Sequence, residues 1–130
     1  MSSRVDINFI QLNMRKAFVA SVELSKLAAS LEKNIVCLIT EPFRRKGKIC
    51  SIPRGFKCIS AQNGARAAIL YGGGTEILMV ENLTNEDCAV GLIKINKRNI
   101  IIVSAYLDIN TTASPEWMQR IIDYLSLIHI

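Results

Sequence analysis

Two polar side chains that could bind a metal ion and a phosphate follow two predicted strands. Residues 5–12 and 34–39 have strand-like patterns, and Asn13 and Glu41 come at their ends. An amphipathic helix separates them, so the three segments form a strand–helix–strand unit with an expected right-handed crossover. Such a unit brings the carboxyl ends of both strands to one rim of a sheet, where ligands of α/β sheets bind. A carboxamide and a carboxylate converging there would form half of a metal-dependent phosphodiester site.

The elements that position these two residues have distinct patterns. Residues 5–12 alternate apolar and polar side chains, as a strand with one wetter face does. Residues 34–39 are almost all apolar, which favours a central strand covered on both faces. Because Pro42 follows Glu41, we expect extended backbone geometry at Glu41. Between the strands, residues 17–31 predict a helix with an apolar stripe at Ala20, Leu24, Leu27, Ala28 and Leu31, and with Ser21 off that stripe.

The rest of the chain predicts hairpins and a final helix. Residues 43–64 resemble a long loop, residues 66–71 and 76–80 a hairpin around Gly72–Gly74, and residues 88–95 and 100–107 a second hairpin with a turn at 96–99. A helix is predicted from an N-cap at Ser114, with Pro115 next and one face formed by Trp117, Ile121 and Leu125. This order indicates a mixed sheet packed against helices, an α/β layered fold.

Size and composition restrict the class of protein. With 130 residues, 50% of them hydrophobic, the chain is expected to form one modest domain. No apolar run approaches the roughly 20 residues that span a membrane, and no secretory leader is visible. The four cysteines lack Cys-x-x-Cys spacing, which favours free buried thiols in a reducing compartment. The only histidine, His129, is the penultimate residue, so a zinc site is not expected.

Basic residues gather immediately after Glu41. The net charge is +5, and a stretch without any acidic residue holds Arg44, Arg45, Lys46, Lys48, Arg54 and Lys57. A basic loop is often only a solvated surface, and the alternative is a contact with nucleic acid. Since this stretch begins three residues after Glu41, on the predicted rim, its position favours phosphate contacts.

Four short segments, in order, carry a resemblance to a known superfamily. They are Gln11-Leu12-Asn13, Ile39-Thr40-Glu41-Pro42, Gly64-Ala65-Arg66-Ala67-Ala68-Ile69 and Val103-Ser104-Ala105-Tyr106. From about residue 5 to residue 124 the chain resembles the endonuclease/exonuclease/phosphatase superfamily, and within it the apurinic-like endonuclease domain of non-LTR retrotransposons. The clade that inserts into ribosomal DNA or telomeric repeats of insects is the most similar. The resemblance implies the N-terminal half of a four-layer α/β-sandwich, with mixed β-sheets flanked by helices.

The resemblance also implies roles for particular residues. Glu41 matches the glutamate that binds the catalytic Mg²⁺, and Asn13 matches the asparagine that helps to hold the metal and the phosphate. Tyr106 matches a tyrosine that hydrogen-bonds the scissile phosphate. The alternatives are a solvated strand end for Glu41, a turn residue for Asn13 and an ordinary strand aromatic for Tyr106. Arg66 begins the next core strand of the family, which implies a structural role.

The chain departs from the family pattern in two ways. Arg15 stands where relatives often have Asn or Asp, so it either weakens metal binding or contacts phosphate directly, together with Arg44, Arg45, Lys46 and Lys48. The family's Asp-x-Asn and Ser-Asp-His motifs have no counterpart. Residues 1–130 are therefore predicted to be a partial domain, truncated before the C-terminal catalytic motifs. Residues 125–130 resemble a translated sequencing adapter, which predicts a departure of the reading frame near Leu125.

The implied function is that of a fragment of a Mg²⁺-dependent endonuclease in a retrotransposon polyprotein. Such a domain nicks target DNA to prime reverse transcription, and the fragment alone is expected to be inactive. The implied partners are DNA and a downstream reverse transcriptase domain, with no membrane, in an intracellular and ultimately nuclear location. Two alternatives remain: a non-catalytic remnant or nucleic-acid-binding module, and a phosphoesterase of the same superfamily acting on another ester, such as a lipid or inositol phosphate.

Overall fold

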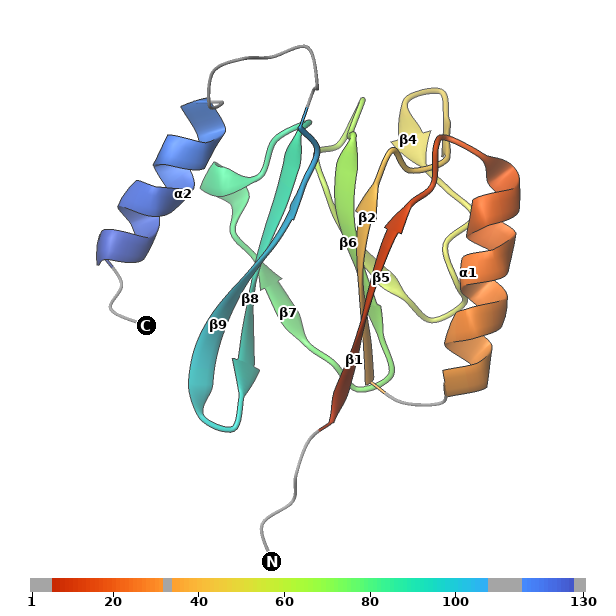
Figure 1. Ribbon diagram of the computed structural model, residues 1–130, viewed down its shortest axis with the longest axis horizontal. Helices are drawn as coiled ribbons and strands as arrows, with labels where there is room; N and C mark the ends of the chain where they lie inside the picture. Colours follow the sequence, from red (N-terminus) through yellow and green to blue (C-terminus); the bar gives the residue numbers. More distant parts are fainter. Residues whose placement is uncertain (1–5, 32–33, 108–115, 128–130) are drawn as a thin grey trace, which may run out of the picture.

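The structure is a computed structural model that describes residues 6–31, 34–107 and 116–127, and its elements form four layers (Figure 1). The outer layers are helices α1 (Phe18–Leu31) and α2 (Glu116–Leu127). The first sheet contains, in spatial order, β1 (Ile7–Asn13), β2 (Asn34–Thr40), β6 (Ala67–Gly72) and β5 (Lys57–Ile59). The second sheet contains β7 (Ile77–Met79), β8 (Cys88–Ile95) and β9 (Arg98–Ala105). The predicted α/β fold with a mixed sheet is confirmed.

The strand–helix–strand unit has the predicted form. β1 and β2 are parallel, with Ile7 paired to Asn34 at one end and Asn13 to Thr40 at the other. β2 is covered on both faces, since Cys37 packs in the cluster under α1 while Val36 packs between the two sheets. Burial raises the pKa of the Cys37 thiol to about 11. The apolar run at residues 34–39 therefore reflects a strand with no wet face.

The contact face of α1 differs from the predicted stripe. Ser21 is buried, with 2% of its surface exposed, whereas Leu27 is 44% exposed. The buried residues of the helix are Ser21, Leu24 and Ala28. The Ser21 hydroxyl donates to the Phe18 carbonyl at 2.7 Å, which satisfies it inside the helix. Because Ser21 is small and its hydroxyl is satisfied within the helix, it can face the first sheet. Leu27 faces solvent instead.

The hairpin predicted for residues 66–71 and 76–80 is wrong. β6 is paired on one side with β2 and on the other with β5, so neither edge is left for β7. β7 pairs instead with β8 in the second sheet. The glycines at 72–74 thus carry the chain from one sheet to the other. A Cβ at Gly72 would lie 2.4 Å from Phe56 Cε1, which explains glycine at this close approach.

The segment predicted as a loop contains short strands. β3 (Arg44–Arg45) and β4 (Lys48–Ile49) form a small hairpin, and β5 joins the first sheet. The second predicted hairpin, β8–β9, is confirmed with a tighter turn than expected. Its turn consists of Asn96 and Lys97, with φ of +50° and +68°, and Ile95 is paired with Arg98.

Helix α2 covers the outer face of the second sheet. Ile121, which is 8% exposed, packs in a cluster with Leu83, Cys88 and Val90. The predicted N-cap Ser114 and Pro115 lie outside the described residues, as do the side chains of Trp117 and Leu125. The short 3₁₀ helix η1 (Glu81–Leu83) supports this layer. No helix within the described ranges is long and apolar enough to cross a membrane.

All four cysteines are free thiols, and they differ in burial. Cys37 and Cys88 are buried, as predicted for free thiols in a core. Cys50 is half-buried and Cys58 is exposed, so the prediction of buried thiols is wrong for these two. Both lie in the segment between β4 and β6, and Cys58 is in β5, the edge strand of the first sheet.

Candidate functional site

One rim of the molecule collects residues from both sheets. It contains the carboxyl ends of β1, β2 and β9 and the amino ends of β6 and β8, because β2–β6 and β8–β9 are antiparallel pairs. In Figure 1 this rim is the upper end of the sheets, opposite the β8–β9 turn. The residues at these ends are Asn13, Glu41, Arg66, Asp87 and Tyr106. We call this edge the rim.

Hydrogen bonds join the two sheets at the rim. The Glu41 N–H donates to the Arg66 carbonyl at 2.9 Å, and the Arg66 N–H donates to the Glu86 carbonyl at 2.6 Å. The Tyr106 N–H donates to the Asp87 carbonyl at 2.8 Å. Just below, the buried Ser104 hydroxyl donates to the Ile39 carbonyl at 2.8 Å. The strand ends are therefore fixed relative to one another by the backbone.

Glu41 does not have the extended geometry predicted from the following proline. Its φ is +48°, in the left-handed region that non-glycine residues rarely adopt. Its N–H bonds to the Arg66 carbonyl, and its own carbonyl accepts the Lys16 N–H at 2.8 Å. Pro42 is fully buried behind it. Tertiary hydrogen bonds on both sides of Glu41 thus overcome its local preference, an arrangement typical of functional sites.

Asn13 opens the turn between β1 and α1. Its side-chain oxygen accepts the Arg15 N–H at 2.9 Å, and both residues are exposed. Arg15 and Lys16 have φ of +51° and +60°, so this side-chain bond stabilises a tight left-handed turn. The turn interpretation of Asn13 therefore has direct support. A carbonyl oxygen has a second lone pair, which leaves a ligand role compatible with this bond.

Tyr106 is half-buried and lies against Arg66. The Arg66 guanidinium carbon is 5.3 Å from the centre of the Tyr106 ring, and Arg66 Nη2 forms an ion pair with Asp87 Oδ1. A cation over an aromatic face is attracted by the ring quadrupole. Arg66 thus directly precedes the core strand β6, close to the position that the resemblance implied, and it also places its side chain at the rim.

The basic residues lie beside the rim on the β3–β4 hairpin. Arg45, Lys46 and Lys48 are exposed and Arg44 is half-buried. Arg44 and Lys16 line a hollow of about 230 Å³ together with Pro42 and Gly47. Since Lys16 bonds to the Glu41 carbonyl, this basic hollow is adjacent to Glu41. Arg15 lies in the same turn as Lys16.

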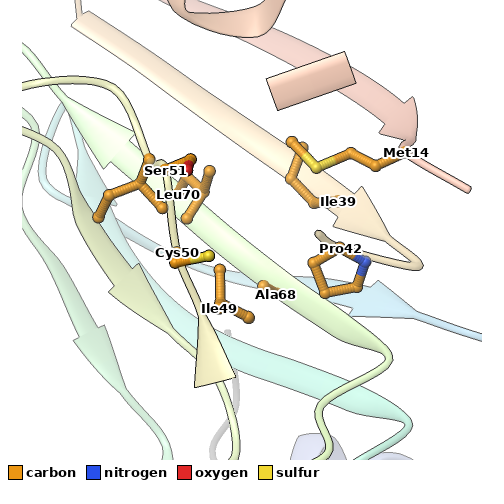
Figure 2. Close-up of a pocket in the computed structure, with 9 residues that line it drawn as sticks. Met14, Ile39, Pro42, Ile49, Cys50, Ser51, Ala68 and Leu70 are labelled. Atoms are coloured by element: carbon orange, nitrogen blue, oxygen red, sulfur yellow. The ribbon is translucent and has the colours of Figure 1, made fainter. Parts of the chain in front are cut away.

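Behind the rim, the space under the hairpin is filled by apolar side chains. Figure 2 shows Pro42, Met14 and Ile39 on one side of a small cavity, with Ile49 and Ala68 facing them. Its volume is about 10 Å³, enough for one water molecule at most. It is therefore a packing gap and not a ligand site. The apolar packing supports Glu41 from behind and leaves the rim as the polar surface.

The donor atoms at the rim fit part of a metal site. Mg²⁺ in phosphoryl-transfer sites is held by one or two carboxylates, waters and the substrate phosphate. Glu41 offers a carboxylate and Asn13 an amide oxygen, from neighbouring parallel strands whose last pair is Asn13–Thr40. Within the described ranges no three His, Cys, Asp or Glu side chains gather to hold a metal ion. Asn13 and Glu41 thus offer two donor groups of the kind that such a site uses, at the ends of neighbouring strands.

Lys16, Asp87 and the side-chain position of Arg66 were not predicted from the sequence. Only the carboxyl ends of strands were expected at the rim, whereas antiparallel pairing also brings the amino ends of β6 and β8 there. Asp87 directly precedes β8, and Arg66 directly precedes β6. A polar residue before an apolar strand was the available signal. It could be interpreted only once the strand directions were known.

Comparisons with known proteins support the fold. No protein-family model matches the chain, and no curated protein matches it. A solved structure does: the endonuclease domain of TRAS1, a telomere-specific non-LTR retrotransposon, matches with a TM-score of 0.72 over 94% of this chain at 22% sequence identity. This chain covers 53% of the length of that one. The chain therefore has an α/β fold like that of about half of a retrotransposon endonuclease domain.

Proposed function

We propose that the chain is part of a Mg²⁺-dependent endonuclease domain of a non-LTR retrotransposon, which nicks target DNA to prime reverse transcription. The main support is the placement of Asn13 and Glu41 at the ends of two adjacent parallel strands. This occurs in a fold like that of a retrotransposon endonuclease domain. The strained Glu41 backbone, held by hydrogen bonds on both sides, adds support because such strain concentrates at functional sites.

Each rim residue has a distinct role in this proposal. Glu41 and Asn13 would hold Mg²⁺, which supplies charge neutralisation at the phosphate when bound. Tyr106 donates its hydroxyl to a phosphate oxygen. The exposed cations Arg15, Arg45, Lys46 and Lys48, with the half-buried Arg44, contact the flanking phosphates of the DNA. In the complete protein we place this domain next to a reverse transcriptase domain, working on chromosomal DNA in the nucleus.

These 130 residues by themselves are proposed to bind DNA without cleaving it. Hydrolysis of a phosphodiester needs a positioned base to activate water. Glu41 is taken up as a metal ligand, and Asp87 is paired with Arg66. In the described part of the chain, no three His, Cys, Asp or Glu side chains are grouped so that they could hold a metal ion. Binding is therefore the measurable activity.

Fluorescence anisotropy with a labelled DNA duplex tests the proposal. Glu41→Gln keeps the size of the side chain and removes its charge, so it should weaken binding in Mg²⁺ roughly tenfold and leave binding in EDTA unchanged. The matched control is Glu76→Gln, an exposed glutamate outside the rim, which should bind like the wild type in both buffers. Equal Mg²⁺-dependent affinity for Glu41→Gln and the wild type would contradict a role for Glu41.

A plasmid-relaxation assay addresses cleavage. The wild-type chain in Mg²⁺ should leave supercoiled plasmid intact; nicking that disappears in Glu41→Gln would refute the predicted inactivity and strengthen the nuclease assignment. A competition measurement distinguishes the alternative phosphoesterase that acts on inositol or lipid phosphates. That alternative is favoured if an inositol phosphate displaces the labelled DNA at a far lower phosphate concentration than an unlabelled duplex does. DNA binding indifferent to both Mg²⁺ and Glu41 would favour a non-catalytic nucleic-acid-binding module.

A further inference from the structure

Arg66 contacts two of the residues on which the proposed chemistry depends, Glu41 and Tyr106. Its backbone carbonyl accepts the Glu41 N–H at 2.9 Å, and its guanidinium lies 5.3 Å from the Tyr106 ring centre. Glu41 follows β2 in the first sheet, and Tyr106 follows β9 in the second. Arg66 is thus a direct link between the two halves of the rim.

Asp87 fixes the Arg66 side chain in this position. Its carboxylate pairs with Arg66 Nη2, and its backbone carbonyl accepts the Tyr106 N–H at 2.8 Å. The three residues Arg66, Asp87 and Tyr106 therefore form a closed set of contacts, which we call the rim cluster. The Arg66 and Asp87 side chains are 41% and 30% exposed, so the cluster lies at the edge of the fold, with the paired Asp87 Oδ1 atom itself buried.

The ion pair alone is a weak explanation for this arrangement. Partly exposed ion pairs contribute little to stability, because water screens them. The backbone bond of Arg66 to Glu86 already joins the sheets, its bond to Glu41 extends the β2–β6 pair, and both would persist with any side chain at this position. What the guanidinium adds is a flat cation that restricts the Tyr106 ring, and only an arginine has the planar fork for pairing and stacking together.

We propose that Arg66 is a positioning residue, which Asp87 orients and which holds the Tyr106 hydroxyl at the rim for a phosphate of bound DNA. This inference rests on the proposed function. The side chain acts through Tyr106, so its effect on DNA binding depends on the presence of the tyrosine hydroxyl. Without that hydroxyl the position of the ring no longer matters.

A double-mutant cycle on the full chain tests this dependence through DNA affinity. Arg66→Gln should weaken binding about two- to fivefold, as expected for loss of a cation–π contact at an exposed site. In the Tyr106→Phe background, which keeps the ring, Arg66→Gln should cause no further loss. Arg66→Lys should not rescue binding, and Asp87→Asn should reproduce the loss. Arg98→Gln, at the far end of β9, removes the same charge and should leave the affinity unchanged.

A second readout does not need DNA. In NMR spectra of the free protein, the Tyr106 ring signals, assigned with Tyr106→Phe, should shift in Arg66→Gln and Asp87→Asn and stay in place in Arg98→Gln. The inference would be overturned if the Tyr106 ring signals did not shift in Arg66→Gln. It would also be overturned if the affinity losses of Arg66→Gln and Tyr106→Phe multiplied fully in the double variant while Glu41→Gln still weakened binding. Shifted ring signals with no Glu41-dependent DNA binding would instead mark failure of the proposed function, and the inference would fall with it.

Discussion

At the scale of single residues, the rim is built from backbone conformations that the chain does not favour locally. Arg15, Lys16 and Glu41 all have positive φ, and Lys16 donates its N–H to the Glu41 carbonyl. Each such non-glycine residue costs on the order of 1 kcal/mol or more. The surrounding hydrogen bonds offset this cost, so the strain is maintained by the fold. Glycine would fit the backbone at Glu41 better, but it would lack the carboxylate.

This strain predicts a trade-off between stability and binding at Glu41. Glu41→Gly should raise the free energy of unfolding by about 0.5–1 kcal/mol, because glycine adopts positive φ readily. The same variant should lose the Mg²⁺-dependent part of DNA binding. Urea denaturation followed by circular dichroism measures the first effect, and anisotropy measures the second.

The control for Glu41→Gly is Glu76→Gly. Glu76 has no positive φ, so glycine there should lower stability by about 0.5 kcal/mol through its greater freedom in the unfolded chain. If both variants lose stability equally, the left-handed conformation of Glu41 is not a source of strain.

At the scale of elements, two hairpins carry basic residues at opposite ends of the molecule. The β3–β4 hairpin has Arg45, Lys46 and Lys48 beside the rim. The β8–β9 hairpin has Lys94, Lys97 and Arg98 in and next to its turn, at the other end (Figure 1). An aromatic contact between Phe43 and Phe18, with ring centres 5.4 Å apart, holds the start of the first hairpin against α1. The two sets of three basic residues carry equal charge. Comparing their variants therefore distinguishes an effect of position on DNA binding from an effect of net charge.

The hairpins predict different salt dependences of DNA binding. Replacing Arg45, Lys46 and Lys48 together by Gln should lower the affinity. It should also reduce the slope of log affinity against log salt concentration by about 0.9 for each lost phosphate contact. The matched triple replacement of Lys94, Lys97 and Arg98 should leave the slope unchanged. Equal slopes for the two triple variants would show that net charge, and not the β3–β4 hairpin, determines binding.

At the scale of the whole molecule, β1 extends beyond the cover of the second sheet. It is an edge strand of the first sheet, and its side chains alternate between the α1 face, with Ile10 and Leu12, and the opposite face. On that opposite face Phe9 is 53% exposed and Gln11 is also exposed. An apolar residue on an open strand edge favours association between copies of a chain.

Phe9→Lys should therefore reduce self-association without lowering the thermal midpoint of unfolding. Sedimentation velocity over a range of protein concentrations measures the association, and calorimetry measures the midpoint. Gln11→Lys is the matched control, since it adds the same charge on the same face of β1 and removes no apolar surface. A loss of stability in Phe9→Lys would show that Phe9 contributes to the core despite its exposure.

Residue patterns alone were enough to predict the local elements and the strand ends at which Asn13 and Glu41 lie. Strict patterns in residues 5–12, 17–31 and 34–39 specify strand, helix and buried strand, because side-chain period follows directly from backbone geometry. Parallel pairing then brings Asn13 and Glu41 to one rim, since a short helical crossover has few alternatives. The β8–β9 hairpin was predictable for the same reason: its strands are adjacent in sequence and joined by a short turn.

The pairing of strands that are distant in sequence, and its effect on single residues, depended on the assembled fold. Local pattern cannot show that β6 pairs with β2 and β5 while β7 joins the other sheet, because β6 is a continuous buried run that is compatible with either arrangement. The left-handed conformation of Glu41 depends on backbone hydrogen bonds with Lys16 and Arg66, each 25 residues away along the chain. The meeting of Arg66 with Asp87 and Tyr106 likewise follows from strand direction, which is a property of the assembled sheets.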